Sequence, residues 1–197
     1  MGWLDNLLGR SKPAKPDLDA LFALPSAAVT LQSATGLAPT GVGSVCFRSA
    51  EGGAFATLEK EIRALLDAGG GPPVEQTRDS YGYTWLVVRR PADDVAALVT
   101  DLHAVNSSLE GAGFGPSLLC SLVAFATDPG DPDDSGGVRR VALVYLYKQG
   151  TFYPFAPVGD QRRDNALELH IRGVLADELR MEPDLGRWFP LWGAPGL

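Results

Sequence analysis

Two cysteines and two histidines are the side chains of this sequence whose ordinary pKa lies nearest to neutral pH, so they are the first candidates for a nucleophile or a general base. Cys46 and Cys120 each lie in an apolar run typical of a strand, which favours buried, reduced thiols. His170 lies within an apolar helical stripe and is expected in the core, and His103 is expected at a core boundary. Sequence spacing does not show whether a cysteine contacts a histidine. We therefore assign no catalytic residue, and an enzyme using a Cys/His pair stays an alternative.

Metal and phosphate sites are not expected. No Cys-x-x-Cys or His-x-x-x-His spacing occurs, as a zinc site would require. An acidic loop places Asp131, Asp133, Ser135 and Gly136 as in the first half of an EF-hand loop. The twelfth position is Ala142 instead of Glu, and strands are expected on both sides of the loop. The glycine-rich stretches 41–44 and 111–115 lack the context of a nucleotide-binding motif. The acidic loop is interpreted as a solvated hairpin tip. We expect no cofactor.

Composition limits the class of protein. The chain has 197 residues, of which 45% are hydrophobic and 21% charged, as in folded globular proteins. Its net charge of −7 disfavours nucleic acid as a partner. No apolar run approaches the roughly 20 residues that span a bilayer, and no secretory signal is recognised at the first residues. A cytoplasmic location, with membrane-peripheral contact as an option, is expected.

Two strands, at 118–126 and 141–147, are predicted to form the centre of the fold. Both runs are almost continuously apolar, whereas a strand with one exposed face alternates apolar and polar residues. Both faces of this pair must therefore be covered. The cover is a partner, a second copy in a homodimer, or an internal segment, for which 26–40 and the C-terminal tail are the candidates.

The remaining elements follow from periodicity and breakers. Further strands are predicted at 42–48, 74–78 and 83–90, and an aromatic crossing at 151–157. Helices are predicted at 17–24, ended by Pro25, at 55–66, at 95–109 with Asp93 as its cap, and at 161–179. Residues 26–40 are predicted to be irregular or partly extended.

This order predicts a two-layer α+β fold, with a mainly antiparallel sheet and helices on one face. The order of elements is similar to that of type III secretion chaperones and of YbjN proteins. Residues 17–197 are expected to form a single domain, preceded by an amphipathic segment and linker at 1–16.

The N-terminal segment is the first candidate contact surface. It carries one apolar helical stripe, made of Trp3, Leu4, Leu7 and Leu8. Arg10, Lys12 and Lys15 follow the stripe and would suit an anionic lipid surface. The alternatives are docking on a protein partner or packing on the chain's own domain.

Two further surfaces are candidates. Arg162 and Arg163 are predicted in the first turn of the last helix, where the helix dipole disfavours cations. They either pair with neighbouring aspartates or receive an acidic partner. In the tail, Arg187, Trp188 and Trp192 either cover the open end of the core, together with Phe189, or form part of a partner site.

The chain resembles the PspAB family of PspA-associated proteins along its full length. The resemblance is carried by LDALFALPS at 18–26, GVGSVCFR at 41–48, DLHAVN at 101–106, VYLYK at 144–148, GTFYPFAP at 150–157, RRDNALEL at 162–169 and GRWFP at 186–190. It implies a cytoplasmic protein associated with PspA in the actinobacterial phage-shock, or envelope-stress, response. It supplies no catalytic residue. We expect a non-enzymatic adaptor that binds PspA or a PspA-associated factor near the membrane. A chaperone-like homodimer is a further alternative.

Overall fold

A computed structural model describes residues 16–49, 52–68, 72–128 and 137–197. The helices are a 3-10 helix at Leu18–Ala23, α1 (Leu24–Thr35), α2 (Gly53–Asp67), α3 (Val95–Gly111), α4 (Asn165–Val174) and short 3-10 turns at Gly115–Ser117 and Leu185–Arg187. The strands are β1 (Ala38–Phe47), β2 (Glu75–Arg78), β3 (Thr84–Arg89), β4 (Leu118–Ala126), β5 (Arg140–Leu146), β6 (Thr151–Phe155), β7 (Pro157–Val158) and β8 (Arg162–Arg163).

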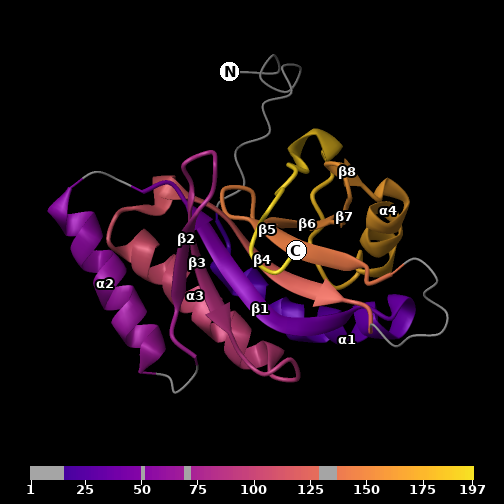
Figure 1. The fold of residues 1–197 in the computed structure, drawn as a ribbon, viewed down its shortest axis with the longest axis horizontal. Coiled ribbons are helices and arrows are strands. Elements are labelled where there is room, and N and C mark those ends of the chain that lie inside the picture. Colours follow the sequence, from indigo (N-terminus) through magenta and orange to yellow (C-terminus); the bar gives the residue numbers. More distant parts are fainter. Residues whose placement is uncertain (1–15, 50–51, 69–71, 129–136) are drawn as a thin grey trace, which may run out of the picture.

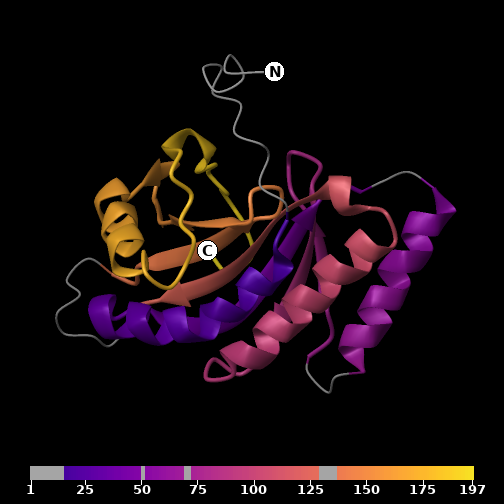
Figure 2. The same cartoon turned by 180° about the vertical axis from the view of Figure 1, so that it is seen from behind.

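The six strands β1 to β6 form one antiparallel sheet in the order β2-β3-β1-β4-β5-β6, and β7 pairs with β8. The helices lie behind this sheet in Figure 1 and in front of it in Figure 2. The C-terminal tail crosses the opposite face. The predicted α+β class, with an antiparallel sheet and helices packed against it, is confirmed.

Each central strand contributes to two separate cores because successive side chains point to opposite faces. On β5, Val141, Leu143 and Tyr145 join the large core beneath the helices. Ala142 and Val144 join a second core beneath the tail. β4 and β5 are therefore apolar on both faces, as their sequences predict.

Helix α3 is the main helical cover of the sheet. Its buried side includes Leu98, Leu102 and Leu109. Its cap is Asp94, whose carboxylate accepts the Ala97 N–H at 3.0 Å, so the predicted cap at Asp93 is wrong by one residue. Asn106 is fully buried; its side-chain amide nitrogen donates to the Leu102 carbonyl and to Ser121 on β4, whereas its side-chain oxygen has no hydrogen-bond partner among the described residues.

The prediction of irregular structure at 26–40 is wrong. Pro25 lies in the first turn of α1, where a missing N–H removes no helical hydrogen bond, so it starts the helix and does not stop it. The helix buries Leu24, Ala27, Ala28 and Leu31 on the helical face of the sheet. It ends at Gly36, whose φ of 72° suits glycine.

The last helix is shorter than predicted. Asp160 and Gln161 adopt left-handed backbone angles, with φ of 62° and 53°, and turn the chain between β7 and β8. Helix α4 begins only at Asn165, because the Asp164 carboxylate caps it by accepting the Leu167 N–H at 2.9 Å. Residues after Val174 form turns. His170 is exposed, which contradicts the predicted core position.

The aromatic crossing at 151–157 contains strand β6. Pro154 obscured it, since proline cannot donate to a sheet ladder, but β6 is an edge strand of the sheet, where proline is tolerated. The free side of β6 is bordered by residues 180–182: Phe152 donates to the Arg180 carbonyl and accepts from the Glu182 N–H.

Candidate functional site: an aromatic cleft beneath the C-terminal tail

The C-terminal tail supplies the cover that the second sheet face requires. Trp188 is 5% exposed and stacks on Tyr153 of β6 with ring centroids 5.9 Å apart. Its indole N–H donates to the Glu182 carbonyl at 3.1 Å. Trp192 packs edge-to-face on Phe155 at 5.1 Å. The tail, rather than residues 26–40, is thus the internal covering segment.

The tail leaves one part of this face open as a cleft. Its volume is about 620 Å³, within the range of roughly 300–1,000 Å³ typical of ligand sites. The floor comes from the strands and the walls from the β2–β3 turn, the β5–β6 turn and the tail. The lining is Cys46, Asp79, Tyr81, Tyr83, Trp85, Leu118, Leu119, Cys120, Leu146, Lys148, Gln149, Tyr153, Arg187 and Phe189 to Trp192.

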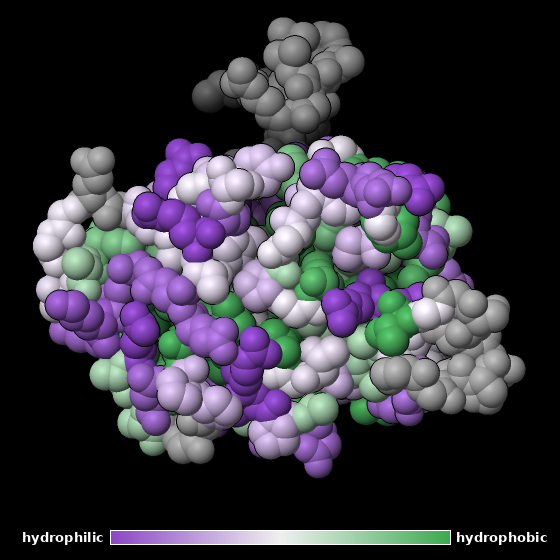
Figure 3. All heavy atoms as spheres, viewed as in Figure 1, coloured by the Kyte–Doolittle hydropathy of each residue, from purple (hydrophilic) through white to green (hydrophobic). Residues whose placement is uncertain are grey.

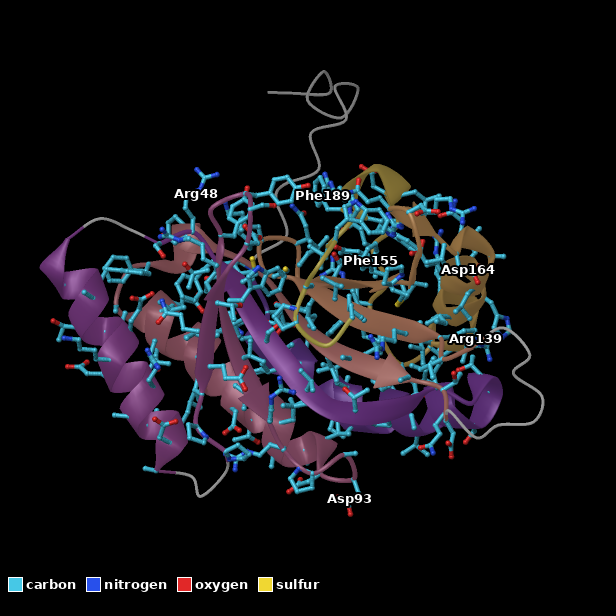
Figure 4. All side chains as sticks on the ribbon, in the orientation of Figure 1. Arg48, Asp93, Arg139, Phe155, Asp164 and Phe189 are labelled. Carbon is cyan, nitrogen blue, oxygen red and sulfur yellow. The ribbon has the colours of Figure 1, made fainter. Side chains whose placement is uncertain are left out.

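The cleft is mainly apolar inside and polar at its rim. Figure 3, which looks onto the face crossed by the tail, shows hydrophobic side chains gathered between hydrophilic ones. Two aromatic side chains of the lining are largely exposed: Tyr81 at 69% and Phe189 at 55%. Figure 4 shows Phe189 at the upper end of the molecule, where Arg48 also lies. Exposed aromatic side chains around an apolar hollow are typical of protein-binding surfaces.

Asp79 organises the aromatic wall of the cleft. Its carboxylate accepts the backbone N–H groups of Tyr81 and Tyr83, both at 2.9 Å, and the Trp85 indole N–H at 3.1 Å. The Arg48 guanidinium lies 5.7 Å from the centroid of the Tyr83 ring, on its face. These contacts hold the β2–β3 turn as a wall of fixed shape.

The two cysteines meet at the floor of the cleft. Cys46 on β1 and Cys120 on β4 are direct cross-strand partners, both buried and both free thiols. A hydrogen bond with Cys120, together with burial, raises the pKa of the Cys46 thiol, so Cys46 is protonated at neutral pH. This environment disfavours a thiolate nucleophile.

Neither histidine reaches the cysteines. His103 is half-buried on α3, on the helical side of the sheet, as the boundary prediction requires. Its imidazole lies 3.2 Å from the Asp19 carboxylate and 4.8 Å from the Phe22 ring. Because the sheet separates α3 from the cleft, and His170 is exposed on α4, the structure assembles no Cys/His pair.

Arg163 lies beneath the tail and ties it to the fold. Its Nε donates to Glu168 at 2.9 Å, its Nη1 donates to the Trp188 carbonyl, and its guanidinium lies 5.1 Å from the Phe155 ring centroid. Glu168 is 2% exposed and also accepts the Ala156 N–H at 2.8 Å. Arg162, its neighbour in β8, is exposed. The prediction that both arginines lie in the first turn of the last helix is wrong, because they form β8 and α4 begins at Asn165.

The other candidate residues fall in separate places. Arg187 lines the cleft, where it donates to Gln149 at 3.2 Å and lies 3.5 Å from Asp184. Trp3, Leu4, Leu7 and Leu8 lie outside the described residues, as does the acidic loop 129–136. In the part of the chain that the structure describes, no group of three or more His, Cys, Asp or Glu side chains could hold a metal ion. None of the described helices is long and apolar enough to cross a bilayer.

Sequence reasoning did not find most of the cleft. Asp79 and Tyr81 fall between the strands predicted at 74–78 and 83–90, Tyr83 begins the second of these strands, and Lys148 and Gln149 were assigned to no site. The available signal was local: a turn with two tyrosines near a buried tryptophan, whose N–H needs an acceptor. Their convergence with the tail depends on strand order, which the sequence does not give.

These features define a two-layer α+β protein with an aromatic cleft between its sheet and its C-terminal tail. The chain belongs to the PspAB family, PspA associated protein B, whose sequence profile matches residues 1–196. The family resemblance inferred from sequence is thereby confirmed. No curated protein and no solved structure matches the chain.

Proposed function

We propose that this protein is a non-enzymatic adaptor of the envelope-stress (phage shock) response, which binds PspA or a PspA-associated factor near the cytoplasmic membrane. Membership of the PspA associated protein B family supports the association with PspA. The aromatic cleft is the observation that supports action by protein binding, because it offers an apolar hollow of about 620 Å³ with exposed aromatic and charged side chains at its edge.

The shape of the cleft suits apolar side chains of a partner segment. Cys46, Trp85 and Cys120 form a buried, weakly polar floor, so an inserted side chain loses contact with water without opposing an unpaired charge. Tyr81 and Phe189, which flank the opening, provide large contact areas at a low cost in conformational entropy. One or two anchoring side chains in such a pocket typically dominate the affinity of a protein complex.

The test is a binding measurement with matched variants. Tyr81→Ala and Phe189→Ala remove exposed aromatic side chains from the cleft, while Leu65→Ala removes an exposed apolar side chain, 58% exposed, from α2 and outside the cleft. We expect each cleft variant to weaken binding to purified PspA by about tenfold or more, because a contact of this kind contributes about 1.4 kcal/mol or more. Leu65→Ala should bind like the unmodified chain.

Calorimetric titration of PspA into each variant, all checked for unchanged unfolding, separates the outcomes. Equal affinity of the cleft variants and the Leu65→Ala control would remove the cleft from the proposed function. An absence of binding between the unmodified protein and PspA would contradict direct association and leave a PspA-associated factor as the partner to be tested with the same variants.

A further inference from the structure

The C-terminal tail, yellow in Figure 1, consists of two parts that are held to the sheet in different ways. The first part ends at Phe189, whose carbonyl accepts a hydrogen bond from the Tyr153 hydroxyl at 2.8 Å. The second part is residues 190–197, which we call the strap. Among the described residues, no hydrogen bond or ion pair joins the strap to the rest of the fold, and its two backbone hydrogen bonds run within it.

Apolar packing alone therefore holds the strap on the sheet. Ala194 is its one buried side chain, at 4% exposed, and Trp192 lies edge-to-face on Phe155 with ring centroids 5.1 Å apart. The other side chains of the strap are half-buried or exposed. A segment with few buried contacts and few hydrogen bonds opens locally at a free energy well below that of global unfolding. The strap is thus able to leave the sheet while Trp188 and the rest of the fold stay in place.

The surface beneath the strap continues the floor of the cleft. Along β4, Cys120 on the floor is followed on the same face by Leu122 and Ala124, because successive side chains alternate between faces. A Cβ placed on Gly196 would lie 2.9 Å from the Ala124 Cβ, so the end of the strap rests directly on this row. The matching positions of the neighbouring strands are also uncharged: Val42, Ser44 and Cys46 on β1, and Ala142, Val144 and Leu146 on β5. Displacement of the strap joins the cleft and this strip into one groove.

Ser44 is a polar group of this strip that the strap leaves without a partner. Its side chain is fully buried on β1, between the tail-facing positions Val42 and Cys46, and its hydroxyl has no hydrogen-bond partner among the described residues. A buried polar group without a partner opposes the closed state. A different segment that presents a backbone N–H or carbonyl to Ser44 gains a hydrogen bond that the strap does not supply.

We propose that a short, uncharged segment of the protein partner, rich in aromatic and aliphatic side chains, displaces the strap and binds in the groove beneath it. The strap itself indicates the chemistry that fits this groove, because its sequence, PLWGAPGL, contains no charged side chain. A charged segment would bury an unpaired charge against an uncharged strip. This inference rests on the proposed function, since it names the kind of segment that the adaptor receives and the part of the tail that controls access.

Local opening of the strap is measured by cysteine labelling of the full-length chain without PspA. Ala194→Cys places a thiol at the buried position of the strap, and Ala28→Cys places one at an equally buried position, 3% exposed, in the core beneath α1. N-ethylmaleimide at pH 8 labels each thiol only when its surroundings open, and peptide mass spectrometry resolves it from Cys46 and Cys120. We expect labelling at position 194 to be about a hundredfold or more faster than at position 28, because the second requires much wider unfolding.

Replacement of the strap by the partner is measured with a variant that locks the strap closed. A Cβ at Gly196 would lie 3.4 Å from the Val42 Cβ, close to the roughly 3.5–4.5 Å that a disulfide spans, so Val42→Cys/Gly196→Cys is expected to form one. The same variant after reduction is the matched control. We expect calorimetric titration with purified PspA to show affinity about tenfold or more weaker in the oxidised form than in the reduced form, because the bound state requires an open strap.

The two measurements fail separately. Equal labelling rates at positions 194 and 28 would overturn the strap, even if PspA binding is lost in Tyr81→Ala and Phe189→Ala and the adaptor is thereby sustained. Equal PspA affinity of the oxidised and reduced forms would overturn replacement of the strap by the partner. Sedimentation at micromolar concentration decides the remaining occupant: a dimer of the unmodified chain that the oxidised lock converts to a monomer would put the tail of a second copy in the groove and overturn the choice of a different protein.

Discussion

Replacement of Arg163 distinguishes a buried structural clamp from a surface contact for a partner. Arg163→Met keeps the length and apolar contacts of the side chain but removes its bonds to Glu168 and to the Trp188 carbonyl. Glu168, with its side chain 3% exposed, would retain only the Ala156 N–H as a donor. Breaking a buried ion pair by removing one partner costs about 3–5 kcal/mol. We expect a loss of about 3 kcal/mol, the lower end, because the Arg163 side chain is 19% exposed.

Arg162 is the matched control because it is the adjacent residue of the same type. Its side chain is 71% exposed and lies 3.9 Å from Asp160, which is 92% exposed. Such surface pairs contribute little, so Arg162→Met should change the free energy of unfolding by less than about 0.5 kcal/mol. Urea denaturation followed by far-ultraviolet circular dichroism measures both variants, and an equal slope of free energy against urea shows that stability alone has changed.

The double variant Arg163→Met/Glu168→Gln completes the cycle. Removing the charge of Glu168 relieves the unpaired carboxylate, so the double variant should be more stable than Arg163→Met by about 1–2 kcal/mol. A destabilisation by Arg163→Met no greater than that by Arg162→Met would refute the clamp. So would additivity of the two single changes, since it would mean that the side chains do not interact.

Two further predictions concern the tail and the N-terminal anchor. Trp188→Ala should lower the free energy of unfolding by about 3–5 kcal/mol, because the ring is buried against Tyr153. Trp192 is only half-buried, so Trp192→Ala should lower it by less than half as much. Equal losses of stability, measured by urea denaturation, would contradict this order. Burial raises the pKa of Tyr145 from 10.0 to about 12 despite its bond to Asp17, so above pH 10 the unfolded chain loses a proton that the folded chain retains. Stability should therefore fall by up to about 3 kcal/mol between pH 10 and 12, and Tyr145→Phe should remove that part of the pH dependence; an unchanged dependence would show that Tyr145 does not titrate as described.

Patterns within one element predicted much of the fold. The unbroken apolar runs of β4 and β5 predicted two covered faces, and periodicity predicted strands at 74–78 and 83–90, where β2 and β3 lie. These predictions succeed because the pleat of a strand and the periodicity of a helix are local properties. The predictions failed where proline is compatible with more than one structure. Pro25 was interpreted as the end of a helix, although it lies in the first turn of α1. Pro154 argued against a strand at 151–157, although β6 is an edge strand, in which proline is tolerated.

The candidate site was predicted only in fragments. Arg187, Trp188 and Trp192 were singled out in the tail, but the tyrosines of the β2–β3 turn and Lys148 were not. Arg162 and Arg163 were treated as one pair, although one is exposed and the other is clamped to Glu168. Adjacent positions of a strand point to opposite sides, so their roles separate only when the sheet and its neighbours are placed.

By itself, the sequence determined that this protein is an α+β member of the PspAB family, and that its central strands need cover on both faces. Those properties depend on residue types at fixed local spacing. Only the tertiary structure decided that the tail provides the cover, that it leaves a cleft, and that Cys46 and Cys120 meet on the cleft floor. The physical reason is that the order of strands in a sheet is fixed by competing long-range pairings, each of which satisfies the same hydrogen bonds. The choice among them follows from the packing of the whole chain.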